Sequence, residues 1–311
     1  MSTEETQTTD ESTTFDKLNI EEDSVKVQEC INTLRELIEG EENLKVKTDD
    51  KFILRYLRWS DFKPGLAFHR LKKVYRFRAR NKDWFCTKPP SEYETELGLN
   101  IHAILKERDS KGRRVFIVKT ANIDADILTP QTMSHLDDLW LESVIDEEET
   151  QKNGLVIILD LAGYSWKMFS WITPNNSRVA CIKVATVTIR KIELHVVNTS
   201  FLLNASMSLI YPFFDPRVLK HIHFHGEDWP SLHKHINPEI LPEEYGGTGP
   251  SIDYIEARKI LYEKSDYLME IFSLGLINYE EELEKEVEKP EPQKDENVDE
   301  GAEDDIVYSP F

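Results

Sequence analysis

The sequence predicts an α/β protein made of a helical N-terminal lobe and a second lobe in which strands and helices alternate. Residues 25–81 carry apolar side chains at helical spacing, with arginines and lysines on the opposite side. After them, short apolar strands such as GLVIILDL alternate with amphipathic helical segments, which is the pattern of a sheet covered by helices. At 311 residues the chain is long enough to bury a core that contains a ligand cavity.

The N-terminal lobe is predicted to be a small helical bundle. Apolar spacing predicts a first helix over residues 25–37, and Asp49 or Asp50 is a suitable N-cap for a second, FILRYLRW. Pro64 is placed to begin a third helix, LAFHRLKKVYRFRAR, which should close the bundle near residue 81.

In the second lobe, each predicted element begins at a turn or cap signal. A turn at residues 109–112 joins two strands of HAILKERDSKGRRVFIVKT, and Thr-Pro pairs at 129–130 and 173–174 begin helices that run to about residues 149 and 187. The remaining predicted elements are the buried strands GLVIILDL and KIELHVV, an apolar helix over 199–214, a short strand HIHFH, a helix near 229–235 and the amphipathic helix DYIEARKILYEKSDYLMEIF.

Composition sets the limits of the folded part. We expect residues 1–15 and 283–311 to be disordered, because both stretches are acidic and poor in apolar side chains. Between them we expect the helical lobe over 16–92, the strand-and-helix lobe over 93–255 and a C-terminal helix over 256–282.

The net charge of −20 belongs mostly to the two ends of the chain. Residues 1–24 carry eight acidic residues against one lysine and residues 280–311 carry fourteen against three, so the body between them is close to neutral. No basic field favours nucleic acid. Three scattered cysteines, no secretory signal and no run of ~18 apolar residues predict a cytoplasmic protein, which would meet a membrane only from outside. Peripheral association is the form that such contact would take.

Catalytic signatures are absent from the sequence, so we expect neither an enzyme nor a cofactor. It contains no G-x-S-x-G, GxxxxGK[ST] or GxGxxG motif. Asp160 and the pair Asp137 and Asp138 belong to different elements, where capping or solvated carboxylates are commoner than a catalytic pair. A metal-dependent enzyme is a weaker alternative.

The one metal-like pattern is the alternation of His221, His223 and His225 along a short predicted strand, which would place three imidazoles on one face. Such a trio could contribute to a zinc site, but it would need a fourth ligand and supporting hydrogen bonds. We therefore expect a structural polar cluster and no metal.

The apolar segment VVNTSFLLNASMSLIYPFF presents two apolar stripes. One consists of Leu203, Met207, Ile210 and Phe214, and the other of Leu202, Leu209 and Phe213. An ordinary buried helix is the simpler alternative, but two stripes suggest two apolar partners, the interior and a membrane. Moving six such side chains into water would cost on the order of 10 kcal/mol, so contact with a bilayer would be the trigger for opening.

Four basic residues flank this segment. Arg190 and Lys191 precede the strand that leads into it, and Arg217 and Lys220 follow it. At about 1 kcal/mol per cation near an anionic leaflet, they would direct the opening towards acidic lipid. Solvated surface charge is the alternative for any one of them.

Several strings, taken in order, resemble the CRAL-TRIO lipid-carrier family, in the branch that contains α-tocopherol transfer protein, retinaldehyde-binding protein and the clavesins. They are DDKFILRYLRWSDFKPGLAFHRL, DSKGRRVFIVK, GLVIILDLAGYSW, the VVN…PFF…HIHFHG block and LPEEYGG, and they span about residues 45–255. The resemblance implies that residues 93–255 form a lipid-binding domain, in which a mixed sheet is the floor of an apolar cavity and a mobile helix is its lid. The apolar segment at 199–214 matches that lid.

The same resemblance implies a phosphoinositide-binding patch at Arg190, Lys191 and Arg217. We include Lys220 in this patch because it follows the apolar segment, close to Arg217 in sequence. A further basic position of that patch, in the N-terminal lobe, is Ser60 in this chain, with Arg58 nearby.

The phosphatidylinositol-transferring branch of the family carries a Glu-Arg pair before this strand and a Lys before the next one. The matching positions here are Ile189 with Arg190, and His221. The missing acid and lysine favour a hydrophobic cargo that is not a phospholipid.

Eight side chains are expected to point into the cavity from the sheet and the lid: Ile117, Ile157, Leu159, Phe201, Leu202, Met207, Ile210 and Phe213. A cavity of about 300–1,000 Å³ lined in this way suits a tocopherol, a retinoid or a similar isoprenoid. The expected function is non-enzymatic transfer of that ligand between membranes. The alternative is a phosphoinositide-sensing adaptor in vesicle trafficking that recruits a protein through its acidic tail.

Overall fold

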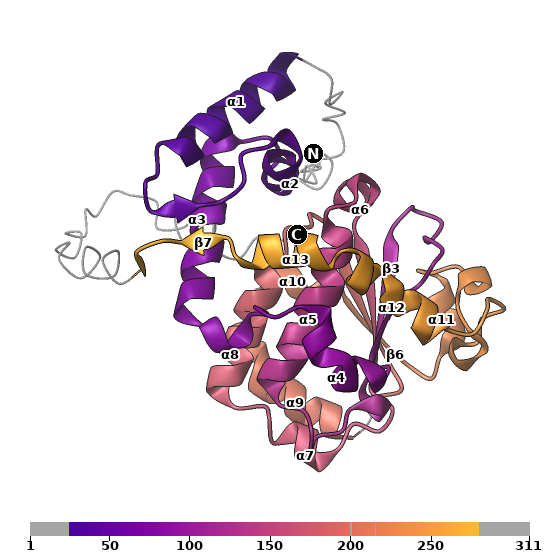
Figure 1. Cartoon of the computed structure of the whole chain (residues 1–311). Coiled ribbons are helices and arrows are strands. Elements are labelled where there is room, and N and C mark those ends of the chain that lie inside the picture. The colour runs from indigo at the N-terminus through magenta and orange to yellow at the C-terminus, as the bar shows by residue number, and fades with distance from the viewer. Residues whose placement is uncertain (1–24, 200, 215, 280–311) are drawn as a thin grey trace, which may run out of the picture.

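The computed structural model describes residues 25–199, 201–214 and 216–279, which form two lobes (Figure 1). The helices are α1 (Val25–Glu39), α2 (Asp50–Trp59), α3 (Pro64–Arg80), α4 (Glu94–Gly98), α5 (Pro130–Ile145), α6 (Glu148–Asn153), α7 (Trp166–Phe169), α8 (Pro174–Ala185), α9 (Leu202–Ile210), α10 (Pro216–Leu219), α11 (Trp229–His233), α12 (Tyr254–Glu263) and α13 (Ser265–Phe272). The strands are β1 (Leu44–Lys45), β2 (His102–Ile104), β3 (Arg114–Lys119), β4 (Leu155–Asp160), β5 (Ile192–Val197), β6 (Ile222–Gly226) and β7 (Gly275–Leu276). The tails expected at 1–15 and 283–311 lie outside the described residues.

The first lobe is the predicted helical bundle of α1, α2 and α3 around one apolar core. The buried positions of α1 recur at helical spacing and are Val27, Ile31, Leu34 and Ile38. The side chain of Asp49 caps α2 by accepting a hydrogen bond of 3.1 Å from the Phe52 backbone N–H, and Pro64 occupies the first turn of α3.

The C-terminal segment differs from the single helix predicted over 256–282. It forms two helices, α12 and α13, that meet at Lys264, and then strand β7, which pairs antiparallel with β1 of the first lobe. The segment contributes to two apolar cores, because Leu268 packs in the second lobe while Ile271 packs in the first. The C-terminal segment thereby connects the two lobes.

The second lobe is built on a five-stranded mixed sheet of order β2-β3-β4-β5-β6. Strands β2 and β3 are antiparallel and are joined at the predicted turn, where Gly112 adopts a φ of +75°. The other three pairs are parallel, so their connections must cross over a face of the sheet. The predicted mixed α/β architecture is confirmed.

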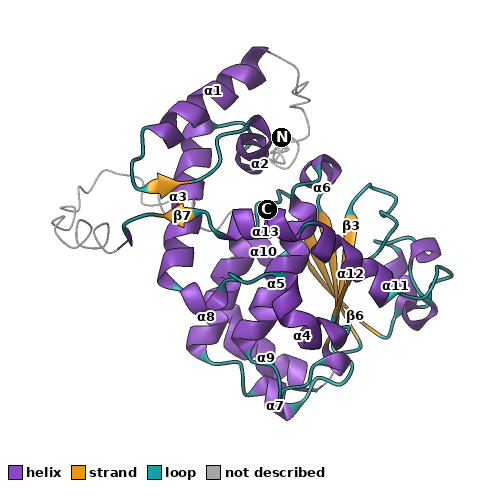
Figure 2. Cartoon of the chain, viewed as in Figure 1, coloured by secondary structure: helices purple, strands orange, loops and turns teal. Residues whose placement is uncertain are grey.

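The two faces of the sheet have different coverings. Helices α5, α8 and α9 lie on one side of it and α11 lies on the other, as Figure 2 shows. Residues Val115, Ile117, Val156 and Ile158 point to the α11 side, where they pack with Leu232, Ile236, Leu241 and Tyr245 into a continuous core. Their neighbours in sequence point to the side of α5, α8 and α9.

None of the helices in the described ranges is both long enough and apolar enough to span a membrane.

A buried ion pair joins the lobes. The Arg55 guanidinium on α2 donates two hydrogen bonds to the carboxylate of Glu142 on α5, one of them 3.0 Å long, and a third to the Thr188 hydroxyl. Arg55 is 7% exposed and Glu142 is 9% exposed. Removing either partner would leave a buried charge without its counterion.

We expect Glu142→Ala to lower the free energy of unfolding by about 3–5 kcal/mol, because the Arg55 charge then stays buried and unpaired. The measurement is urea denaturation followed by far-ultraviolet circular dichroism. The double variant Arg55→Met/Glu142→Leu should lose much less, and Glu256→Ala, which breaks a surface pair with Lys259, should leave the urea midpoint unchanged. Equal losses for the single and the double variant would contradict the pair's role.

Candidate functional site

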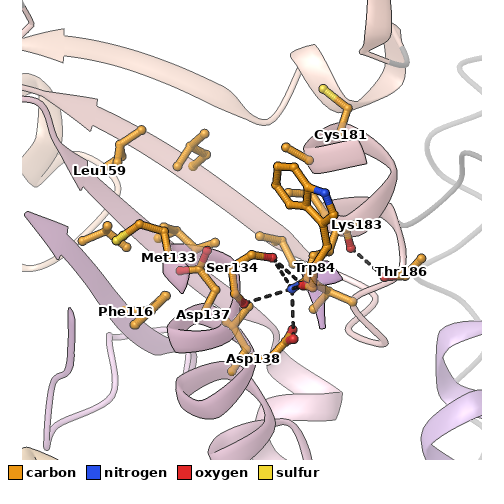
Figure 3. A pocket seen from close by; sticks show the side chains of 18 of the residues that line it. Trp84, Phe116, Met133, Ser134, Asp137, Asp138, Leu159, Cys181, Lys183 and Thr186 are labelled. Atoms are coloured by element: carbon orange, nitrogen blue, oxygen red, sulfur yellow. Dashed lines mark hydrogen bonds and ion pairs between the residues drawn. The ribbon is translucent and has the colours of Figure 1, made fainter. Parts of the chain in front are cut away.

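An apolar cavity of about 610 Å³ lies between the sheet and helices α5, α8 and α9. Its floor consists of alternate residues of four neighbouring strands, which are Phe116, Val118, Ile157, Leu159, Leu194, Val196, Ile222 and Phe224. Side chains from α5 and α8, together with others from α2, α3 and α13, form the wall. Figure 3 shows Met133, Leu159 and Cys181 around the open space. The volume is within the range of small-molecule sites.

Helix α9 covers the cavity with the first of the two predicted stripes. Leu203, Met207, Ile210 and Phe214 all line the open space. The helix is shorter than predicted, because it ends at Ile210 and a 3₁₀ turn containing Pro212 follows over Tyr211–Phe213. The second stripe is divided, since Leu202 is buried while Leu209 is 46% exposed.

Four of the eight predicted cavity residues line the open space, namely Ile157, Leu159, Met207 and Ile210. The other four do not. Ile117 is fully buried on the opposite face of the sheet, because it is one residue out of phase with Phe116 and Val118. Leu202 is buried and Phe213 is half-buried, but neither lines the cavity, and Phe201 points outward with 76% of its surface exposed.

Sequence reasoning missed the polar end of the cavity. Lys183 of α8 places its ammonium 2.9 Å from the Asp138 carboxylate and 2.6 Å from the Trp84 carbonyl oxygen (Figure 3). It also donates to the Ser134 carbonyl oxygen at 2.9 Å. These groups come from three separate segments, so no local pattern could have grouped them.

The polar end is satisfied within the protein. Burial raises the pKa of Asp138, and the adjacent Lys183 ammonium opposes that rise. A lysine has three N–H donors, and all three can be used by the acceptors that surround Lys183. The charges of Lys183 and Asp138 therefore compensate each other at this end of the cavity.

A hydrogen bond holds the lid to the body of the lobe. The Tyr164 hydroxyl, just after β4, lies 2.9 Å from the Ser206 hydroxyl of α9. Because Ser206 donates its own proton to the Leu202 carbonyl at 2.9 Å, Tyr164 is the donor to Ser206. Burial raises the pKa of Tyr164, so this donor stays protonated at neutral pH.

The lid is also the crossover between two parallel strands. It leaves the carboxyl end of β5 and returns to the amino end of β6, where the Leu194 backbone N–H donates to the His221 carbonyl at 2.9 Å. Arg190, Lys191 and Lys220 gather at this amino-terminal edge, with Lys191 and Lys220 exposed. The side chain of Arg217 is not among those described.

Two of the predicted headgroup residues make contacts between the two lobes. Arg190 lies 3.0 Å from the Asp61 carboxylate, at the turn between α2 and α3. Arg58 is mostly buried, donates to the side-chain oxygen of Gln151 and lies 3.9 Å from the Glu148 carboxylate. Arg58 therefore stabilises the contact between α2 and α6 in this structure.

The carboxylates considered as a catalytic pair have separate structural roles. Asp160 accepts hydrogen bonds from the Ala162 backbone N–H at 2.9 Å, the Asn198 amide at 2.8 Å and the Tyr245 hydroxyl at 3.1 Å. Asp137 lies 3.0 Å from a ring nitrogen of His102.

The three histidines predicted to share one face do not share one. His221 precedes β6 and lines the cavity, whereas His223 and His225 point to the other side of the sheet. There they meet His195 of β5, which no sequence pattern had linked to them. Burial and the neighbouring imidazoles lower the pKa of His195 to about 3, so this ring is neutral at physiological pH.

An apolar cavity over a mixed sheet, closed by a helix, defines a lipid-binding class of protein, and the comparisons agree. The CRAL/TRIO domain family model matches residues 100–247. Clavesin-2 of Homo sapiens is 30% identical over 278 residues, which cover 86% of this chain and 84% of that protein. Clavesin-1 of Xenopus laevis is 31% identical over 247 residues, which cover 76% of this chain and 73% of that protein.

The chain therefore belongs to the CRAL/TRIO domain family, a family of lipid-binding and lipid-transfer proteins. The crystal structure of Sfh5 has the same fold, with a TM-score of 0.50 at 15% identity, and the match covers 80% of this chain and 99% of that one. The predicted family is confirmed.

We expect Leu159→Trp to lower the affinity for a fluorescent apolar probe by about tenfold, because the larger ring occupies the cavity. The matched control is Ile158→Val, one residue earlier on β4 but on the packed face. It should cost about 1 kcal/mol of stability and leave probe affinity unchanged. Equal loss of probe binding in both variants would show that the cavity is not where the probe binds.

Proposed function

We propose that this protein binds a small hydrophobic ligand in the cavity under α9 and transfers it between membranes without making or breaking bonds in it. The observation that carries the proposal is the apolar cavity of about 610 Å³ that α9 covers on one side. A soluble chain that keeps such a space recovers the lost packing contacts only when a ligand fills it.

The polar end of the cavity supports a cargo without a phosphate group. Lys183, the cation facing this space from α8, is already surrounded by Asp138, Ser134 and the Trp84 carbonyl. A phosphate headgroup would have to displace these partners. The arrangement favours a tocopherol, a retinoid or a similar isoprenoid, whose polar groups are few.

The outer surface of the lid supports opening at a membrane. Phe201 is 76% exposed and Trp166 of α7 is 63% exposed, and their rings meet edge to face with centroids 5.9 Å apart. Leu209 and Tyr211 are also largely exposed. Aromatic side chains of this kind insert into the interfacial region of a bilayer, so membrane contact would stabilise a displaced lid.

The cations at the amino-terminal edge of β5 support a preference for anionic lipid, including phosphoinositides. Arg190, Lys191 and Lys220 lie where the lid rejoins the sheet. A membrane that attracts them meets the end of the lid first. The proposed location of the protein is therefore the cytoplasm, with peripheral and reversible membrane contact.

We expect Arg190→Glu/Lys220→Glu to weaken binding to phosphoinositide-containing vesicles at least about tenfold, because two attractive charges become repulsive. Sedimentation with vesicles measures this, and ligand affinity in detergent should stay the same. The control Lys45→Glu/Lys259→Glu makes the same change in net charge on β1 and α12 and should retain vesicle binding. Loss of ligand affinity in the first variant would mean that the two residues act on the cavity.

We expect Tyr164→Phe to speed release of the ligand in water about fivefold, because the lid loses a hydrogen bond worth about 1 kcal/mol. Stopped-flow fluorescence of a bound apolar probe measures the rate. The control Ser208→Ala removes an exposed lid hydroxyl that bonds only within the helix, to the Asn204 carbonyl at 2.9 Å. An unchanged rate in Tyr164→Phe would show that this bond does not limit opening.

The adaptor function is the second candidate, and the acidic C-terminal stretch with its final DDIVYSPF favours it. Deletion of residues 283–311 separates the two. A carrier without these residues still transfers ligand between vesicles, whereas an adaptor loses its protein partner.

A further inference from the structure

We propose that the opposite face of the sheet holds a zinc-binding site formed by Glu193, His195, His223 and His235. One carboxylate oxygen and one nitrogen from each imidazole lie within 4.8 Å of one another. This set differs from the trio predicted in the sequence, of which it keeps only His223. The proposal does not depend on the lipid-transfer function.

The sheet brings two elements of the site together. Glu193 and His195 are alternate residues of β5, so they point to the same face, away from the cavity. His223 of β6 is the register partner of His195, and the centroids of the two rings are 4.9 Å apart. The site therefore crosses the β5–β6 pair.

The chain after α11 supplies the fourth residue. The ring centroid of His235 lies 4.4 Å from that of His223 and 4.9 Å from that of His195. These separations are those of stacked and tilted aromatic rings, and in this packing one nitrogen of each ring turns towards the same point as the Glu193 carboxylate.

The buried ring of His195 has a nitrogen without a partner. His195 is 0% exposed, and its Nε2 atom makes no hydrogen bond within the described structure. The nearest carboxylate oxygen, on Glu193, is 3.6 Å away, which is too long for a hydrogen bond. A buried nitrogen that is left in this way destabilises the fold unless something binds it.

The other nitrogen of His195, Nδ1, has a hydrogen-bond partner that is compatible with a proton on Nδ1 and none on Nε2. Nδ1 lies 2.9 Å from Nε2 of His225, whose Nδ1 lies 2.8 Å from the Ser231 hydroxyl oxygen. When each ring donates its Nδ1 proton along this chain, Nε2 of His195 presents a free lone pair to Glu193, His223 and His235. Donation in the reverse direction would place a proton on Nε2 of His195, which then could not bind a cation, so a metal at this position requires the first arrangement.

The donor set suits zinc. Neutral imidazole nitrogen and carboxylate oxygen bind Zn²⁺ at about 2.0–2.2 Å, and four protein ligands make a closed tetrahedral site without an open position for catalysis. Zinc ligands are ordinarily held by a second layer of hydrogen bonds. Here His225 lies behind His195, and the Arg113 guanidinium lies 2.6 Å from the Glu193 carboxylate.

Such an ion would fix the two ends of the lid. The lid departs after β5 and returns before β6, and the four proposed ligands join both strands to the segment after α11. A metal at this position would hold β5 and β6 together while the lid between them moves. The site is thus a structural clamp on the lid's two attachment strands.

The test uses the full chain, stripped with a chelator and then dialysed against micromolar Zn²⁺, with bound metal measured by mass spectrometry. We expect one zinc per chain, and a rise in Tm of about 5–10 °C when free zinc is 100 times Kd. Co²⁺ in place of zinc should give the visible absorption of a tetrahedral site. His223→Ala and His235→Ala should each lose the metal and the Tm rise.

The matched control is His233→Ala, two residues before His235 on α11, where the ring contacts the Tyr245 carbonyl at 2.9 Å instead of the cluster. This variant should still bind one zinc per chain, even if the substitution lowers its Tm. If His223→Ala fails to fold, His235→Gln is used instead, and we expect it to lose the visible absorption of tetrahedral Co²⁺. Absence of zinc from the unmodified chain would overturn the proposal. One zinc per chain in the His235 variants would also overturn it, because the metal would then be bound adventitiously at the surface.

Discussion

The structure depends on the alternation of side chains along four strands that are covered on both faces. On one face, residues such as Val156 and Ile158 pack against the segment after α11 and leave no large space. On the other, Ile157 and Leu159 face a hollow of about 610 Å³. A shift of one residue in any strand would exchange these two environments, so the register that builds the packed core also keeps the cavity open.

A cavity of this size requires a rigid frame, and buried charges supply part of it. The pair Arg55 and Glu142 ties the helical lobe to α5, and Lys183 with Asp138 ties α8 to α5 at the end of the cavity. Each charge is compensated where it lies, since an unpaired ion in an apolar wall would cost several kcal/mol. The same compensation leaves the Lys183 ammonium with its hydrogen-bond donors already used, which suits an oily ligand at this end of the cavity.

The lid both covers the cavity and connects two parallel strands. As the link between parallel strands β5 and β6, it must cover one face of the sheet. Its inner stripe closes the cavity, while Phe201 and Leu209 remain exposed on its outer side. The proposed opening of the lid would leave the sheet intact only if its two attachment strands stay paired, and the cluster of His195, His223 and Glu193 lies across those strands on the far face.

The sequence by itself determined the helical lobe, the main alternation of strands and helices and the apolar stripe of Leu203, Met207, Ile210 and Phe214, because these follow from local spacing and from cap and turn residues. The mixed sheet and the lid were expected from the resemblance to the family. Only the tertiary structure decided which parity of β3 faces the cavity, so Ile117 was assigned to the wrong face. It also decided the polar end at Lys183 and the histidine cluster, whose members are separated by up to 99 and 42 residues respectively. Such groups meet through packing of distant segments, and no local periodicity in one chain records which distant side chains will become neighbours.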